Sequence, residues 1–211
     1  MFWAVLVMCA GARPLQAQVS LEGMTGSAYN VPTPLTIHQD GYPDIQLTAR
    51  YQTRPFGPFA PYYSMRVSFW NGRQAWEFQQ VHHRLFLANT TAEVQAFAIH
   101  YGYNYFLIGH AWRTAPFVLH VSGGIVVANP SSTIRGKSLN TPNPGALDVG
   151  YRLSGFGAEV AVSRQLNVVK HLYVLVDGAV LMGWASVPVV GGSARVPNVG
   201  LHGHVGLGVS F

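Results

Sequence analysis

Residues 199–211 read VGLHGHVGLGVSF, and this C-terminal stretch decides the fold. Its odd-numbered positions are apolar apart from Gly203, and its even-numbered positions carry glycine, histidine or serine. Successive side chains of a β-strand point to opposite faces, so this alternation predicts a strand with one apolar face and one small or polar face. The strand ends on an aromatic residue, Phe211.

The same alternation recurs through most of the chain. It predicts strands at 45–51, 63–69, 97–107, 117–127, 156–162 and 172–184. Residues 74–87 are ambiguous, because Trp76 and Phe78 share a face with His82 and Arg84; a bulge or a projecting segment would account for them. With that segment and the C-terminal strand, the sequence has about eight candidate strands.

The composition favours a membrane protein without spanning helices. The chain has 211 residues, enough for one domain, and charged residues make up only 10% of it. Beyond the first dozen residues, no apolar run approaches the ~20 residues of a spanning helix. In hydrocarbon every backbone N–H and C=O must be paired, so a closed barrel is the remaining way to span. We therefore expect an all-β, antiparallel up-and-down transmembrane β-barrel.

The C-terminal strand resembles the last strand of Gram-negative outer-membrane β-barrels, which commonly ends in Phe after alternating apolar residues. The resemblance implies that the barrel-assembly machinery reads the ending at Phe211 and that the protein resides in the outer membrane. It indicates the broad class of small outer-membrane barrels and no particular member. A soluble β-sandwich or lipocalin, with its apolar face inward, is the alternative fold and would have to enclose the large aromatic side chains.

An even number of strands places both ends of the barrel on the periplasmic side. Short periplasmic turns are then expected at 71–73, 113–115 and 167–170. Longer external loops are expected at 54–61, 88–94, 129–150 and 188–198.

Residues 1–17 read as a signal peptide, with an apolar stretch at 2–10 and Ala17 before the expected cut. The single cysteine, Cys9, lies within it, so no disulfide or thiol chemistry is expected in the mature chain. We assign residues 18–43 to an N-terminal segment that forms a plug, a short helix or an extra hairpin giving ten strands. Pro32, Pro34 and Pro43 argue against one continuous strand there. The barrel is assigned to residues 44–211.

If the apolar faces meet lipid, the polar faces gather in the lumen. An eight-stranded barrel is barely wide enough inside for side chains, so we expect a packed polar network. Arg50 and Arg66 should pair there with Glu77, Glu159 and Asp177, because an isolated buried charge is very costly. The other residues predicted to face the lumen are His83, His100, Asn104, His110, His120, Ser122, His202 and His204.

Two of these histidines share a strand face, since His202 and His204 are two residues apart. A metal site would need a third ligand, from His100, His110 or His120, because zinc is usually held by three or four ligands. The spacing fixes no third ligand, so we expect hydrogen-bonded histidines and neither metal nor cofactor.

His120 and Ser122 place a base and a hydroxyl on one strand face, and Glu159 lies on the next predicted strand. These are the three roles of an activated serine nucleophile. The set is similar to that of the lipid A deacylase family, small outer-membrane barrels that use a His-x-Ser pair and a Glu from the following strand to remove an acyl chain. The resemblance implies that Ser122 is the nucleophile, His120 the base and Glu159 the residue that orients it.

The formal net charge of +5 favours acidic surfaces as partners. Arg135, Lys137, Arg152 and Arg195 lie in or beside predicted external loops, where outer-membrane lipid and lipopolysaccharide would be close. Nucleic acid is not expected, because no compact basic stripe is present. We expect an outer-membrane barrel of structural, interaction or small-molecule passage type; the alternative is a serine-type lipid A esterase. Whether a pore is open, and the oligomeric state, do not follow from the sequence.

Overall fold

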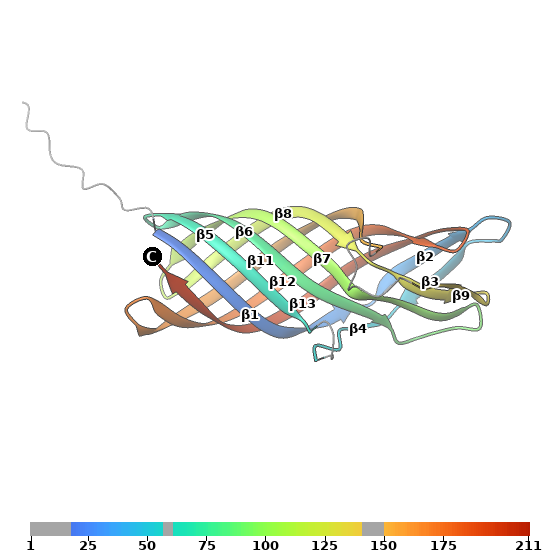
Figure 1. Ribbon diagram of the computed structural model, residues 1–211, viewed down its shortest axis with the longest axis horizontal. Helices are drawn as coiled ribbons and strands as arrows, with labels where there is room; N and C mark the ends of the chain where they lie inside the picture. The colour runs from blue at the N-terminus through green and yellow to red at the C-terminus, as the bar shows by residue number, and fades with distance from the viewer. Residues whose placement is uncertain (1–17, 57–60, 141–149) are drawn as a thin grey trace, which may run out of the picture.

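The computed structural model describes residues 18–56, 61–140 and 150–211, so the predicted signal peptide lies outside the described residues. Eight antiparallel strands form the wall of a closed barrel (Figure 1). They are β1 (Gln18–Val31), β5 (Tyr63–Asn71), β6 (Gln74–Leu87), β7 (Val94–Thr114), β8 (Phe117–Ala128), β11 (Arg152–Val169), β12 (Leu172–Val189) and β13 (Gly192–Ser210). β1 pairs with β13 on one side and with β5 on the other, which closes the ring.

The predicted barrel and strand number are confirmed, but the N-terminal assignment is wrong. Residues 18–31 are the wall strand β1, so the barrel begins before residue 44. Residues 45–51, predicted as a wall strand, fall instead in β3 (Ile45–Ala49) and β4 (Tyr51–Gln52), which lie outside the ring. The sequence gives only a weak signal for β1, because Gly23, Thr25 and Ser27 interrupt its apolar face. The prolines that argued against a strand come only after it ends.

β1 continues almost directly into β2 (Thr33–Gln39), interrupted by Pro32. β2 pairs with the same neighbour, β13, but one residue out of step: Val31 faces Val199, whereas Thr36 faces Arg195. β2 then turns back into β3. The region 188–198, expected to be a loop, is instead the tip of a regular β12–β13 hairpin that ends in a tight turn.

Beyond the wall, strands extend from the end of the barrel opposite the C-terminus (Figure 1). The ends of β12 and β13 with β2 and β3 make one group, and β4, β9 (Ser131–Ile134), β10 (Lys137–Leu139) and the ends of β6 and β7 make another. We call these two groups the cap. Their apolar side chains share one core, to which the cap contributes Leu35, Ile37, Ile45, Val94, Phe97, Ile134, Val187 and Val189.

At the other end, short turns join β5 to β6, β7 to β8 and β11 to β12, where the sequence predicted them. The chain termini of the barrel, Gln18 and Ser210, lie at this turn end.

All eight wall strands carry exposed large apolar side chains on the outer face, and we call this surface the apolar belt. It includes Leu21, Tyr29, Met65, Phe69, Trp76, Phe78, Ile108, Phe117, Val121, Ile125, Phe156, Val160, Val162, Val176, Val180, Trp184, Leu201, Val205 and Leu207. In the part of the chain that the structure describes, no helix is long and apolar enough to cross a membrane.

Candidate functional site

The centre of the lumen is built around Arg66, which points inward from β5 and is fully buried. Its guanidinium is 3.1 Å from Glu22 of β1, 3.1 Å from Asp177 of β12 and 3.9 Å from Glu159 of β11. Its Nε donates to Gln79 Oε1 of β6 at 3.1 Å. The planar guanidinium presents its N–H groups in a fixed fork, so one side chain can engage several acceptors at once. Arg66 thereby connects five wall strands.

The carboxylates around Arg66 are held by further donors. Gln79 Nε2 donates to Glu159 Oε2 at 3.2 Å, and Gln165 Nε2 donates to Glu22 Oε1 at 3.0 Å. The Tyr173 hydroxyl donates to the same Glu22 oxygen at 2.8 Å. Buried charges of this kind persist when they are paired and hydrogen-bonded, and here only Glu159 Oε1 lacks a hydrogen bond among the described residues, with the Arg66 guanidinium 3.9 Å away.

A second chain of contacts runs from Asp177 toward the cap. His204 Nδ1 is 2.6 Å from Asp177 Oδ1, and its Nε2 is 2.6 Å from the hydroxyl of Tyr62. His202 Nδ1 is also 2.6 Å from that hydroxyl. Nearby, His83 Nε2 is 2.9 Å from Asn30 Oδ1. His83, His202 and His204 are therefore hydrogen-bonded in the lumen, and Tyr62 connects the last two.

No metal-ligand set emerges from these histidines. Within residues 18–56, 61–140 and 150–211, no group of three or more His, Cys, Asp or Glu side chains is arranged to hold a metal ion. Tyr62, rather than a third imidazole, lies between His202 and His204.

A third set of contacts involves Glu77 of β6. Ser68 Oγ donates to Glu77 Oε1 at 2.6 Å, and His120 Nδ1 lies 2.8 Å from Glu77 Oε2. His120 Nε2 lies 2.9 Å from Ser163 Oγ of β11. His120 comes from β8 and reaches across β7, where its register partner is the small residue Ala111.

The predicted arrangement of Ser122, His120 and Glu159 does not form. Ser122 faces Glu159 across the β8–β11 pair, but its hydroxyl has no hydrogen-bond partner among the described residues. His120 is engaged by Glu77 and Ser163 instead, and Glu159 by Gln79. The reason is that inward side chains of a narrow barrel reach across the lumen, so adjacency along a strand does not determine their partners.

Glu77, His120 and Ser163 do follow the order of a carboxylate, an imidazole and a hydroxyl. Ser163 is fully buried, and Glu77 and His120 are nearly so. A nucleophile must come within about 3 Å of a substrate carbonyl, and Ser163 in a filled lumen offers no such access. This set of buried hydrogen bonds ties β6, β8 and β11 together.

Several residues predicted for the lumen lie elsewhere. Arg50 is exposed between β3 and β4, with its backbone N–H donating to Asn89, so it takes no part in the network. His110 lies on the outer face, with its ring 5.1 Å from that of Trp76. Asn104 also faces outward, and His100 lies half-buried near the cap, 3.0 Å from Ser131 Oγ.

His110 and Asn104 lie outside the lumen because the inner and outer faces of β7 are the reverse of those predicted. Tyr103, Tyr105 and Leu107, predicted to meet lipid, are fully buried in the lumen core. The cap half of the lumen is filled by tyrosine and aliphatic side chains rather than by charges, so apolar residues lie on both faces of β7. Alternation alone could not tell which face is which.

Sequence reasoning missed several residues of the network, among them Ser68, Gln165 and Tyr173. Glu22 lies in the segment assigned outside the barrel, and Tyr62 precedes its predicted strand. Gln79 lies in the ambiguous segment, and Ser163 follows directly after the strand predicted at 156–162. Of these residues, only Glu22 could have been recognised from the sequence, because it lies within 19–24, where apolar and polar residues alternate.

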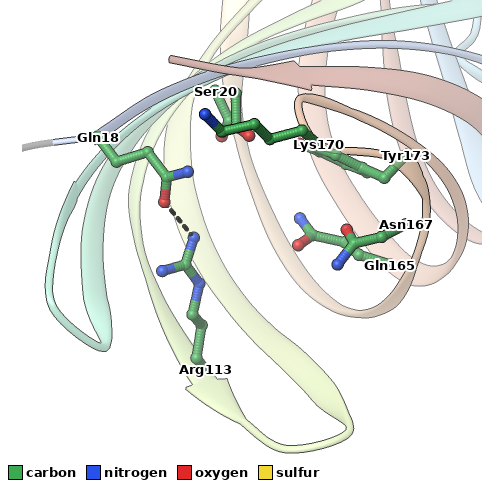
Figure 2. A pocket seen from close by; sticks show the side chains of 8 residues that line it. Gln18, Ser20, Arg113, Gln165, Asn167, Lys170 and Tyr173 are labelled. Carbon is green, nitrogen blue, oxygen red and sulfur yellow. Dashed lines mark hydrogen bonds between the residues drawn. The ribbon is translucent and has the colours of Figure 1, made fainter.

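The turn end of the lumen opens into a basin of about 290 Å³ (Figure 2). Arg113 donates to Gln18 Oε1 at 3.0 Å at one side, and Lys170 extends from the β11–β12 turn at the other. Gln165 and Tyr173 line the basin and hold Glu22 on their inner side. The basin therefore ends at the charged network and does not continue through the barrel.

No family model and no curated protein matches this chain. Among solved structures, the chain is similar to Ail, the attachment invasion locus protein of Yersinia pestis, at 12% identity and a TM-score of 0.43, covering 92% of this chain and 99% of that one. It is similar to Neisserial surface protein A at 8% identity and a TM-score of 0.40, covering 92% and 97%. It is also similar to the outer membrane protease OmpT from Escherichia coli at 11% identity and a TM-score of 0.45, covering 93% and 97%.

Proposed function

We propose that this protein is a Gram-negative outer-membrane β-barrel that anchors its cap at the cell surface, in a structural or interaction role. The observation that carries the proposal is the apolar belt around a closed ring of an even number of strands. Soluble monomers rarely expose contiguous apolar patches beyond a few hundred Å², whereas the wall of a membrane barrel must be apolar outside.

The dimensions of the belt agree with a bilayer. On β12 the outward residues from Leu172 to Trp184 are apolar or glycine, a run longer than the ~9–11 residues that a tilted strand needs. Aromatic residues lie toward both edges of the wall, as membrane interfaces favour. Phe69 pairs with Trp76 near the turn end, and Phe156 pairs with Trp184 nearer the cap.

The filled lumen favours structure or interaction over passage. The side chains of Arg66, Glu159 and Asp177 have no exposed surface, and the cap half of the lumen is closed by an apolar core. The charged network and the apolar core of the cap half therefore both block the axis of the barrel.

The geometry does not support the alternative function, a lipid A esterase. His120 and Ser122 are separated into different contacts, and the carboxylate, imidazole and hydroxyl of Glu77, His120 and Ser163 are buried. The surfaces that a partner could bind are therefore the outer surface of the barrel and the exposed surface of the cap.

Cysteine labelling in intact cells tests the proposal. The only natural cysteine, Cys9, lies in the predicted signal peptide, so single cysteines can be introduced without a competing thiol. Ser193→Cys lies on the exposed cap hairpin and Arg73→Cys on a turn at the opposite end. A membrane-impermeant maleimide should label Ser193→Cys in intact cells, and label Arg73→Cys only after the outer membrane is permeabilised.

Equal labelling at both positions, or recovery of the protein in the soluble fraction, would overturn the membrane assignment. Labelling of Arg73→Cys alone would show the reverse orientation and overturn the surface exposure of the cap.

A further inference from the structure

The outer face of the barrel wall contains a groove of about 660 Å³ on the cap side of β5 to β8. Its lining is mainly apolar and aromatic, with three polar side chains. The lining residues are Pro61, Tyr63, Met65, Gln80, His82, Asn104, Phe106, Val127 and Tyr151. In a membrane barrel this surface faces lipid, so the groove is open to the bilayer rather than to the lumen.

The wall is irregular beside this groove. Going along β6 from His83 to Leu85, the partner on β7 changes from Tyr103 to Ile99, so β7 carries two extra residues in a bulge. Gly102 within the bulge has φ +123, and a Cβ there would collide with the amide of Asn104. Bulges redirect side chains, and they are frequent next to functional sites. Here the bulge orders the outward-facing Asn104.

His82 and Asn104 give the groove a polar base. His82 Nδ1 lies 2.7 Å from Asn104 Oδ1, and Asn104 Nδ2 donates to the carbonyl of Val127 at 3.3 Å. Since Asn104 Oδ1 is an acceptor, Nδ1 of His82 is the donor, and in the neutral ring Nε2 is then an acceptor. That Nε2 is buried and has no partner among the described residues. Such an atom on a lipid-facing wall calls for a hydrogen-bond donor from a ligand.

The ring of Tyr63 covers His82, with the two rings stacked 5.0 Å apart and 10° from parallel. Tyr151 closes the cap side of the groove by donating to the carbonyl of Tyr101 at 2.8 Å. The imidazole is thereby fixed in place, and His82 as a whole is only 5% exposed.

Two arginines lie at the cap side of this site. Arg84 is two residues beyond His82 on the same face of β6, a separation of roughly 7 Å along a strand. Its Nε donates to the carbonyl of His100 at 2.9 Å, and its Nη1 donates to the carbonyl of Arg54 at 3.3 Å. The guanidiniums of Arg54 and Arg84 both lie within 5 Å of the Phe86 ring centroid, at 4.5 and 4.9 Å.

Neither arginine has a carboxylate within 4.0 Å in the described part of the chain. Two neighbouring cations without a counter-ion form a site for a phosphate, to which guanidinium groups can donate paired hydrogen bonds. By contrast, Arg135 in the cap is engaged by Glu93, Gln39 and the carbonyl of Pro43. Among the described residues, Arg54 and Arg84 therefore lie side by side near the groove with no carboxylate in contact, unlike Arg135.

We propose that the groove binds one molecule of a phosphorylated outer-leaflet glycolipid, the lipid A part of lipopolysaccharide. Its phosphate binds Arg54 and Arg84, one acyl chain lies along Met65, Phe106 and Val127, and a hydroxyl or amide N–H of the lipid donates to His82 Nε2. The proposal rests on the proposed function, which places the cap side of the wall in the outer leaflet.

Lipid retention by the purified full barrel tests this site. The barrel in detergent is incubated with lipid A, dephosphorylated lipid A or phosphatidylethanolamine, and bound lipid is counted by native mass spectrometry. We expect the wild type to retain one lipid A in preference to the other two. Arg54→Gln with Arg84→Gln should lower lipid A retention at least tenfold and abolish the preference for the phosphorylated form.

A second variant tests the contribution of the groove separately from that of the arginines. Met65→Trp fills the groove and should lower retention of both forms of lipid A. Matched controls are Leu207→Trp on the outer face of β13 and Arg195→Gln on the cap, which should bind as the wild type does. Labelling His82 with ¹⁵N should show its Nε2 resonance shift when lipid A is added, as it accepts a hydrogen bond.

Equal retention of phosphatidylethanolamine would overturn the proposal in favour of a general lipid layer. Displacement of lipid A by millimolar inorganic phosphate would overturn it in favour of a simple anion site. The heat-dependent electrophoretic mobility of each variant reports a folded barrel, so a folded barrel without lipid A overturns only this site, whereas failure to insert overturns the proposed function.

Discussion

At the residue scale, Arg66 is the side chain on which the lumen depends most. It is the one cation in contact with Glu22, Glu159 and Asp177 among the described residues. Removing it would leave Glu22 and Glu159 without a positive partner and Asp177 with only the His204 imidazole. An uncompensated buried charge is far more costly than the loss of a hydrogen bond.

We therefore expect Arg66→Met to lower the free energy of unfolding by about 3–5 kcal/mol. Urea titration of the detergent-folded barrel measures the effect. Arg195→Met, on the exposed cap, is the control and should stay within about 0.5 kcal/mol of the wild type. Equal stability of Arg66→Met and the wild type would show that the network is not held by this cation.

His38 provides a pH-dependent contact at the tip of the cap, outside the membrane-spanning wall. Its Nδ1 is 2.8 Å from Asp44 Oδ1, and its Nε2 is 3.6 Å from Asp40 Oδ1. The hydrogen bond to Asp44 and the charge of that carboxylate raise the pKa of His38 above its usual 6.5, with a smaller contribution from Asp40. Since the pKa is higher in the folded state, the pair stabilises the hairpin fully below about pH 6.5 and is lost as the pH rises through the raised pKa.

NMR titration of His38 should show this raised pKa in the folded protein. Asp44→Asn should lower the pKa of His38, and Asp40→Asn should lower it less. A His38 pKa that is unchanged in Asp44→Asn would contradict the assigned pairing.

At the element scale, the bulge of β7 requires Gly102. Its φ of +123 is a conformation that residues with a Cβ rarely adopt, and the added methyl group would also meet Asn104. We expect Gly102→Ala to destabilise the barrel by about 1–3 kcal/mol, measured by urea unfolding. Gly23→Ala on β1 is the control, because nothing lies within 4 Å of the added Cβ, and a similar loss in both variants would argue against a special role for the bulge.

The end of β13 closes the barrel against β1. The backbone N–H of Phe211 donates to the carbonyl of Val19 at 2.9 Å, and the residue is 71% exposed. Deleting Phe211 should reduce the amount of heat-modifiable barrel in the outer membrane, because the terminal aromatic is the expected signal for assembly. Leu153→Ala removes another exposed apolar side chain and should assemble normally. Normal assembly without Phe211 would count against the signal.

The strands differ in how readily their faces were inferred. For β5, β8, β11, β12 and β13, the predicted faces agree with the structure, although Leu181 and Val187 of β12 also point into the lumen core. In β7 the inward face is itself apolar, because Tyr103 and Tyr105 pack in the lumen core. Periodicity reports that two faces differ, but it does not report which one meets lipid.

At the scale of the whole molecule, the barrel is closed along its axis. The basin at the turn end stops at Glu22, and the cap core fills the opposite half. We expect the purified protein to produce no stable conductance when inserted into planar bilayers, in the same preparation whose insertion is confirmed by electrophoresis. Reproducible unitary currents would show that the network opens and would restore a role in passage.

The sequence by itself determined the class of the fold. Strand alternation, the absence of long apolar helices and the terminal Phe211 are local or compositional properties, and they suffice to predict an antiparallel barrel of about eight strands. They also sufficed to place Arg66, Glu77, Asp177, His202 and His204 in the lumen, since each opposes an apolar residue on its own strand.

Only the tertiary structure decided which of these side chains meet and where the chain departs from the barrel. His120 contacts Glu77 across β7, and Arg66 contacts carboxylates from three other strands. Ring closure and the narrow lumen bring those atoms together, and neither is recorded in the spacing along any one strand. The cap and the outer groove have the same origin, because strand length, register and bulges determine them through pairing between distant segments.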